Sequence, residues 1–101
     1  IGEIIRMAIG QLQEDLTEQK TDILLRVNDR VIDFLLRESA DKPEEGARLV
    51  QKKLDHYVRD PVDAMMQTGQ LQKGDTLYVN MEQVNNEQRP VFRANMKKRI
   101  K

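Results

Sequence analysis

The stretch that decides the fold is residues 21–36, TDILLRVNDRVIDFLL, where the hydrophobic pattern changes from strand-like to helical. Thr21–Val27 contains a short apolar run that favours a strand, although periodicity alone leaves so short a run ambiguous. Asn28 comes next, and its side-chain oxygen can accept a helix N–H, so it is expected to cap a helix. Apolar residues then return at helical spacing, which predicts a helix ending near Ser39.

An amphipathic helix is expected before this stretch, from the first residues to about Gln19. Its apolar stripe recurs at steps of three and four residues and consists of Ile1, Ile5, Ile9, Leu12 and Leu16, widened by Ile4 and Ala8. The opposite face is expected to be solvated and carries Arg6, Gln13, Glu14 and Glu18.

A third helix is expected after the connector of residues 40–46, beginning at Ala47 or Arg48. Pro61 falls inside its apolar stripe, so the helix should kink or break there. If it breaks, Asp60 would cap the second piece. Gly69 then suits the left-handed residue that ends a helix.

The remaining pattern is β-like. Lys73–Asp75 and Asn85–Asn86 predict turns, Thr76–Asn80 predicts a second strand, and Val91–Phe92 after Pro90 predicts a third. The fold class is therefore α+β, in the order helix, strand, helix, kinked helix, strand, strand.

Composition excludes several classes of protein. The chain has 101 residues, enough for one domain, and its 17 basic and 17 acidic residues balance to zero net charge. This balance argues against a dedicated binder of nucleic acid or anionic membranes, and no apolar run is long enough to span a bilayer. Without cysteine the chain has no disulfide, thiolate metal site or cysteine nucleophile, as expected of a cytoplasmic protein. Ile1, Gly2 and Glu3 open the chain with an acid instead of a basic region, so we expect no signal peptide. Because the chain does not begin with Met, we expect a piece of a larger protein.

Two possible chemical motifs fail on inspection. Gly69–Gly74 has the glycine spacing of a phosphate-binding loop, but Asp75 follows where lysine is needed, and the loop joins helix to strand instead of strand to helix. His56 and Asp60 share a helical face, yet no second histidine exists to complete a metal site. We therefore predict no catalytic residue, no metal site and no activity of the chain alone.

Arg48 stands at the start of the third helix, where free N–H groups and the helix dipole suit an anion. An arginine there can grip phosphate with two hydrogen bonds. Glu44 and Glu45 could instead pair with it, and an ordinary solvated arginine is a third interpretation. The residues alone leave these alternatives open.

Three blocks in series resemble the C-terminal small domain of Clp-family AAA+ unfoldases. They are GARLVQKKL at Gly46–Leu54, RDPV at Arg59–Val62 and GQLQKGDTLYV at Gly69–Val79. The resemblance covers residues 1–93 as one domain and leaves 94–101 as a basic, flexible tail. Departures from the family pattern include Leu49 in place of proline and Gln51 in place of a basic residue.

The resemblance implies a lid that closes over ATP bound jointly with an absent large domain. Arg48 matches the family's nucleotide-sensing "sensor 2" arginine, with Gly46 and Ala47 as its supporting motif. It also implies contacts with neighbouring protomers of a hexamer, unfolded protein substrates and, in some members, a Clp-type peptidase. The alternative function is a stand-alone adaptor or interaction module with the same fold.

A lid must bury one of its faces on the large domain, so an exposed apolar patch is expected on the first helix and on Val58–Met66. The competing interpretation is that Met65 and Met66 simply belong to the core. The tail run Lys97–Lys101 is expected to be solvated, or else to touch phosphate or an acidic partner.

Overall fold

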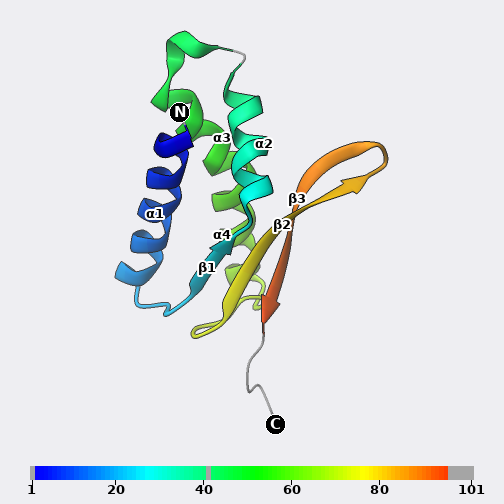
Figure 1. The fold of residues 1–101 in the computed structure, drawn as a ribbon. Helices are drawn as coiled ribbons and strands as arrows, with labels where there is room; N and C mark the ends of the chain where they lie inside the picture. The colour runs from blue at the N-terminus through cyan, green and yellow to red at the C-terminus, as the bar shows by residue number, and fades with distance from the viewer. Residues whose placement is uncertain (1, 41, 96–101) are drawn as a thin grey trace.

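The computed structural model describes residues 2–40 and 42–95 and confirms the α+β class (Figure 1). In chain order the elements are α1 (Gly2–Glu18), β1 (Leu24–Val27), α2 (Asp29–Ser39), the 3₁₀ turn η1 (Pro43–Glu45), α3 (Ala47–Leu54), the π-helical turn η2 (Asp55–Arg59), α4 (Asp60–Gln67), β2 (Thr76–Val84) and β3 (Glu87–Asn95). The predicted order is therefore correct. Ala94 and Asn95, which were assigned to the flexible tail 94–101, belong to β3, and residues 96–101 lie outside the described part.

The three strands form one sheet in the order β1-β2-β3. β1 pairs parallel to β2, because α2, α3 and α4 lie between them in sequence and carry the chain back to the same end. β2 and β3 form an antiparallel hairpin whose tip projects away from the helices (Figure 1). Asn85 and Asn86 make its turn with positive φ of 54° and 67°, a conformation that asparagine tolerates and that matches strand twist.

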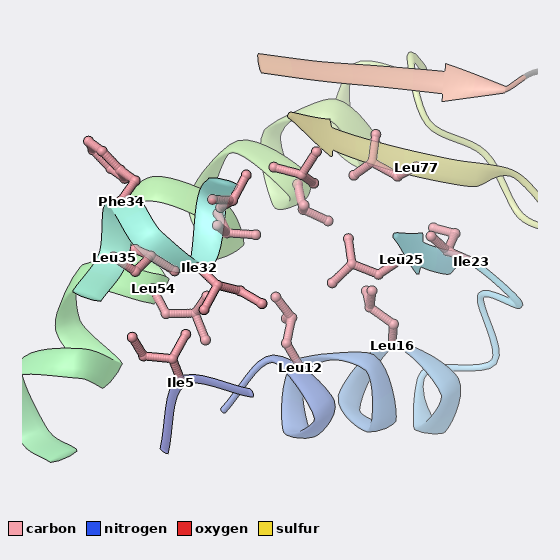
Figure 2. Close-up of a cluster of buried hydrophobic side chains, with 14 of the residues drawn as sticks. Ile5, Leu12, Leu16, Ile23, Leu25, Ile32, Phe34, Leu35, Leu54 and Leu77 are labelled. Atoms are coloured by element: carbon pink, nitrogen blue, oxygen red, sulfur yellow. The ribbon is translucent and has the colours of Figure 1, made fainter. Parts of the chain in front are cut away.

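A single apolar cluster fills the space between the helices and one face of the sheet (Figure 2). Helix α1 contributes Ile5, Leu12 and Leu16 to it, with the partly buried Ala8 and Ile9 packed against it, as predicted. Ile4 is 36% exposed and does not widen the stripe as predicted, and Ile1 lies outside the described residues. From the sheet come Leu25, Leu77 and Val79, whose strand neighbours point the other way because side chains alternate between faces.

Helix α2 begins as its sequence predicts. The Asn28 side chain accepts a hydrogen bond from the Arg30 backbone N–H at 2.8 Å. Gly69 and Gly74, with φ of 82° and 88°, make the left-handed turns that the sequence assigns to the link between α4 and β2.

Gln13 is not the solvated residue that the helical pattern predicts. Its side-chain N–H donates to the Ile23 carbonyl at 2.9 Å, and its side-chain oxygen accepts from the Leu25 N–H at 2.7 Å. The amide thus pairs with the outer edge of β1 as a neighbouring strand would, and it covers backbone groups that could otherwise recruit another strand.

A kink or a break was predicted at Pro61, and the structure shows no break there, so the predicted cap at Asp60 is wrong. Asp60 has helical backbone angles, and its N–H donates to the Asp55 carbonyl, five residues back. Proline has no N–H and its ring crowds the carbonyl four residues earlier, here that of Tyr57. The wider π turn η2 absorbs this conflict, so α3, η2 and α4 run on without interruption.

The strands differ from prediction mainly in length. β1 begins only at Leu24, because Lys20 and Asp22 adopt positive φ and turn the chain between α1 and the sheet. β2 and β3 each extend beyond the expected cores, and β3 runs through Pro90 to Asn95. Pro90 is tolerated because β3 is an edge strand of the described sheet, where a missing N–H need not cost a ladder bond.

Candidate functional site

The candidate site is the start of α3, which packs beside α1 and α2 (Figure 1). Gly46 precedes it with φ of 51° and ψ of −124°, a conformation that residues with a side chain rarely adopt. The Val50 N–H donates to the Gly46 carbonyl at 3.2 Å, so the N–H groups of Ala47, Arg48 and Leu49 have no partner within the helix. The helix start therefore presents the three donors of its first turn with no side-chain cap on Gly46.

Arg48 is exposed on this first turn, while the two residues after it are anchored. Leu49 and Val50 are buried, and they fix the turn against the body of the domain. Within residues 2–40 and 42–95, Arg48 makes no hydrogen bond or ion pair. Its guanidinium is thus held on a fixed backbone with its donors available to a ligand. Leu49, which stands where the family pattern has proline, accounts for the anchoring.

The nearby acids do not pair with Arg48 in the described structure. The ion pair of Glu45 is with Lys42, at 4.0 Å on the surface. Glu44 is exposed in η1. No contact among the described residues therefore supports the competing interpretation, in which these carboxylates neutralise Arg48.

A polar chain that the sequence did not predict links α1 to the helical segment formed by α3, η2 and α4. The Arg59 guanidinium contacts Asp15 of α1 and Asp55 of η2, each at 3.0 Å. Gln11 donates to Asp15 at 3.1 Å, and Gln51 donates to Asp55 at 2.9 Å. Arg59 and Asp55 are one helical turn apart and were readable as a pair, whereas Asp15 lies 44 positions from Arg59 and gives no local signal.

These contacts shift two ionisation equilibria. The Gln11 amide, followed by the Arg59 guanidinium, lowers the pKa of the Asp15 carboxyl. Burial acts to lower the pKa of Arg59, but the hydrogen bonds to Asp15 and Asp55 outweigh it and raise that pKa above its ordinary value. Both groups are therefore charged at neutral pH, and they hold α1 against η2.

His56 and Tyr57 lie at a different place, in a hollow of about 580 Å³ between α2, η2 and β3. The exposed His56 ring lies 4.8 Å from that of Tyr57, and Phe34 packs edge-on against Tyr57 at 4.9 Å. Burial, followed by the charge of Glu38, raises the pKa of Tyr57. The structure does not bring these residues to Arg48.

The predicted apolar patch is half correct. On α1, Ile4 and Met7 are 36% and 72% exposed. Val58 and Val62 are fully buried, so the second segment does not form the patch that was expected. Met65 and Met66 pack against the core but are only half-buried, short of the full burial that the core interpretation requires.

Two searches of residues 2–40 and 42–95 bear on other kinds of site. No group of three histidine or acidic side chains there is arranged to hold a metal ion. None of the described helices has the length and hydropathy that crossing a bilayer requires.

Comparison with known proteins now gives the family. The model of the C-terminal, D2-small domain of ClpB protein matches residues 1–79. The chaperone protein ClpB of Gloeobacter violaceus is 28% identical over 93 residues, which is 92% of this chain and 10% of that protein. The chaperone protein ClpB of Nitratidesulfovibrio vulgaris is 32% identical over 81 residues, which is 80% of this chain and 9% of that protein. The chain thus spans about a tenth of these curated relatives, in agreement with the Clp-family resemblance of its motifs, and it belongs to the family of ClpB C-terminal D2-small domains.

Proposed function

We propose that this chain is the lid subdomain of an ATP-driven protein chaperone and that Arg48 is its nucleotide-sensing residue. The observation that carries the proposal is the start of α3. An exposed guanidinium without a partner in the described structure stands there beside three N–H groups that have no partner in the helix. Charge and donors of this kind suit the oxygens of a phosphate.

The residues present fit only part of a nucleotide site. The chain has no loop in which a lysine follows the second glycine, since Asp75 occupies that position. It therefore lacks the group that would cradle the phosphates in a complete site. ATP would be held jointly with a large domain elsewhere in the same protein, and the chain by itself would hydrolyse no ATP.

The arrangement suits a reporter of the state of the nucleotide. Arg48 lies on α3, which is continuous with η2 and α4 and is tied to α1 through Arg59. A phosphate that attracts Arg48 would thus pull on the whole helical layer and not on a loose loop. We infer that the lid turns as one body when the nucleotide changes, and that neighbouring protomers of a hexamer respond to this movement.

The proposal places the chain in the cytoplasm, with unfolded proteins as substrates of the complete chaperone. A peptidase partner is not part of it, because both relatives carry the name of a chaperone.

Replacing Arg48 by alanine in the full-length protein tests the assignment. ATP turnover should fall more than tenfold, which corresponds to about 1.4 kcal/mol of lost transition-state stabilisation. Lys52→Ala, an exposed change one turn further along α3, is the matched control and should alter turnover less than twofold.

The same substitution in the chain alone separates function from folding. Its melting temperature should move by less than about 3 °C, because an exposed first-turn arginine contributes little to stability. Turnover within twofold of wild type in the full-length Arg48→Ala variant would show that the sensor assignment is wrong. A much lower melting temperature would show that Arg48 acts through the fold.

A further inference from the structure

The helices pack against one face of the sheet and leave its outer face open. Core residues occupy the inner face, and the alternate side chains of all three strands point outward. Leu24 and Tyr78 on this outer face are 44% and 39% exposed.

The strand register places two arginines on either side of Tyr78. Arg26 of β1 is the partner of Tyr78 in the parallel pair, and Arg93 of β3 is its partner in the antiparallel pair. The three residues form one row across the sheet, and all three are exposed. Because neighbouring strands lie about 4.8 Å apart, the backbones that carry the two arginines are about 10 Å apart.

The charge of this row is not neutralised by its surroundings. Neither Arg26 nor Arg93 makes a hydrogen bond or ion pair within residues 2–40 and 42–95. The acids nearest in sequence are Asp29 and Asp75, each three residues from the row. Asp75 is buried and accepts a hydrogen bond from the Gln72 N–H, and Asp29 lies 4.0 Å from Arg6. Two guanidiniums that form no ion pair within the described residues thus flank an exposed aromatic ring.

The neighbouring residues add shape to this charge. A shallow hollow of about 360 Å³ lies at Tyr78, Asn80, Arg93, Ala94 and Asn95. Leu24 lies two residues before Arg26 on the same face, beside Thr76, and supplies a second apolar contact. Exposed tyrosine and arginine around a small apolar centre are the composition of binding hot spots.

We propose that this outer face, which we call the Arg26–Tyr78–Arg93 face, docks an acidic helix of a partner protein. Two carboxylates seven residues apart lie on one side of a helix and are about 10.5 Å from each other, which matches the spacing of the two arginines. An apolar side chain midway between them would lie on Tyr78 and Leu24. The proposal does not depend on the nucleotide role of Arg48, which lies on a helix beyond the opposite side of the sheet.

Charge and sequence decide between the possible occupants. No described helix of this chain has two acidic residues seven positions apart, so a second copy does not supply the complementary pattern. Single-stranded nucleic acid is the less favoured occupant, because the face has one aromatic ring for stacking and the chain has zero net charge.

The test is fluorescence anisotropy with a labelled, designed helical peptide that carries two glutamates seven residues apart and a leucine midway. The same peptide with glutamine for both glutamates, a peptide with the glutamates four residues apart, and a short labelled oligothymidylate are measured in parallel. Arg26→Glu/Arg93→Glu is the face variant. Arg6→Glu/Arg30→Glu, on α1 and α2, is the control with the same change in charge.

We expect the seven-spaced peptide to bind and the face variant to weaken its affinity more than tenfold, with the control variant within twofold of wild type. Circular dichroism checks that each variant folds, and Arg26→Gln/Arg93→Gln replaces the face variant if it does not. The proposal is overturned if the peptide does not bind, if the control variant loses as much affinity, or if the four-spaced peptide binds equally well. Binding of the oligothymidylate in preference to the peptide would also overturn it and assign the face to nucleic acid.

Discussion

Gln13 offers the sharpest test of how the helices hold the sheet. Its side-chain amide makes the two hydrogen bonds to Ile23 and Leu25 that stand in for a neighbouring strand, at 2.9 and 2.7 Å. Replacing Gln13 by alanine removes both bonds, each worth about 1 kcal/mol net. The better helix propensity of alanine offsets a few tenths of a kcal/mol of the lost free energy of unfolding. We therefore expect a loss of about 1.5–2 kcal/mol, or about 10 °C in melting temperature for a domain of this size.

The Gln13→Glu variant separates the donor from the acceptor. A glutamate can still accept from the Leu25 N–H, but its carboxylate cannot donate to the Ile23 carbonyl and instead faces another oxygen. Protonation restores a donor, so folding should raise the pKa of this glutamate above its unfolded value of about 4.3. The stability difference from wild type should then be small at low pH and grow as the pH rises through the folded pKa.

Urea denaturation followed by circular dichroism at several pH values measures both variants. Gln11→Ala is the matched control, because Gln11 lies on the same helix and its amide makes one exposed bond, to Asp15. It should cost less than about 0.5 kcal/mol. If Gln13→Ala lowers the free energy of unfolding no more than Gln11→Ala does, the amide does not hold the edge of β1 and the account of the α1–sheet contact is wrong.

Two further substitutions test particular contacts by the same denaturation assay. Ser39→Ala should raise stability by about 1 kcal/mol, because the Ser39 hydroxyl is buried without a partner within the described residues; a loss of stability would mean that the hydroxyl is hydrogen-bonded after all. Arg59→Ala should lower the melting temperature by about 5 °C at neutral pH through the loss of its contacts to Asp15 and Asp55. The folded pKa of Asp15 lies below its ordinary value of 3.8, so the stability from this contact is present above that value and is lost as the pH falls. The melting temperatures of wild type and Arg59→Ala should therefore become equal in acid. A difference in melting temperature that persists in acid would assign the effect to packing.

The parts of the fold that follow from local sequence were predictable. The stripe of α1, the Asn28 cap of α2 and the left-handed Gly69 each depend on residues within a few positions of one another. The hairpin turn at Asn85–Asn86 belongs to the same class, because asparagine tolerates positive φ. Such features are visible in sequence because their causes are local.

The errors have a common cause in contacts between distant parts of the chain. Gln13 looked solvated by helical position, but its partners lie 10 and 12 residues away on β1. A break at Pro61 was one of two predicted outcomes, because the sequence does not show that packing of Val58 and Val62 into the core favours a π turn over a break. The second and third strands were set too short, since pairing between β2 and β3 extends each beyond its own apolar run.

Some features of the candidate site were likewise predictable from the sequence, and others required the structure. Arg48 was found through a series of motifs and its position at a helix start, both of which are readable in sequence. Its exposure and the burial of Leu49 beside it required the structure. Two features arise only when the chain folds, so no spacing in the sequence predicts them. They are the contact of Arg59 with Asp15 and the row of Arg26, Tyr78 and Arg93.

The central claim, that Arg48 senses the terminal phosphate, is tested most directly by comparing nucleotide affinities. The measurement is the Kd of the full-length protein for ADP and for a slowly hydrolysed ATP analogue, before and after Arg48→Ala. The account predicts that affinity for the ATP analogue falls about tenfold or more, while affinity for ADP changes less than threefold, because only the former carries the phosphate that the guanidinium would contact. Equal losses for both nucleotides, or no loss for either, would contradict the assignment of Arg48 as the sensor.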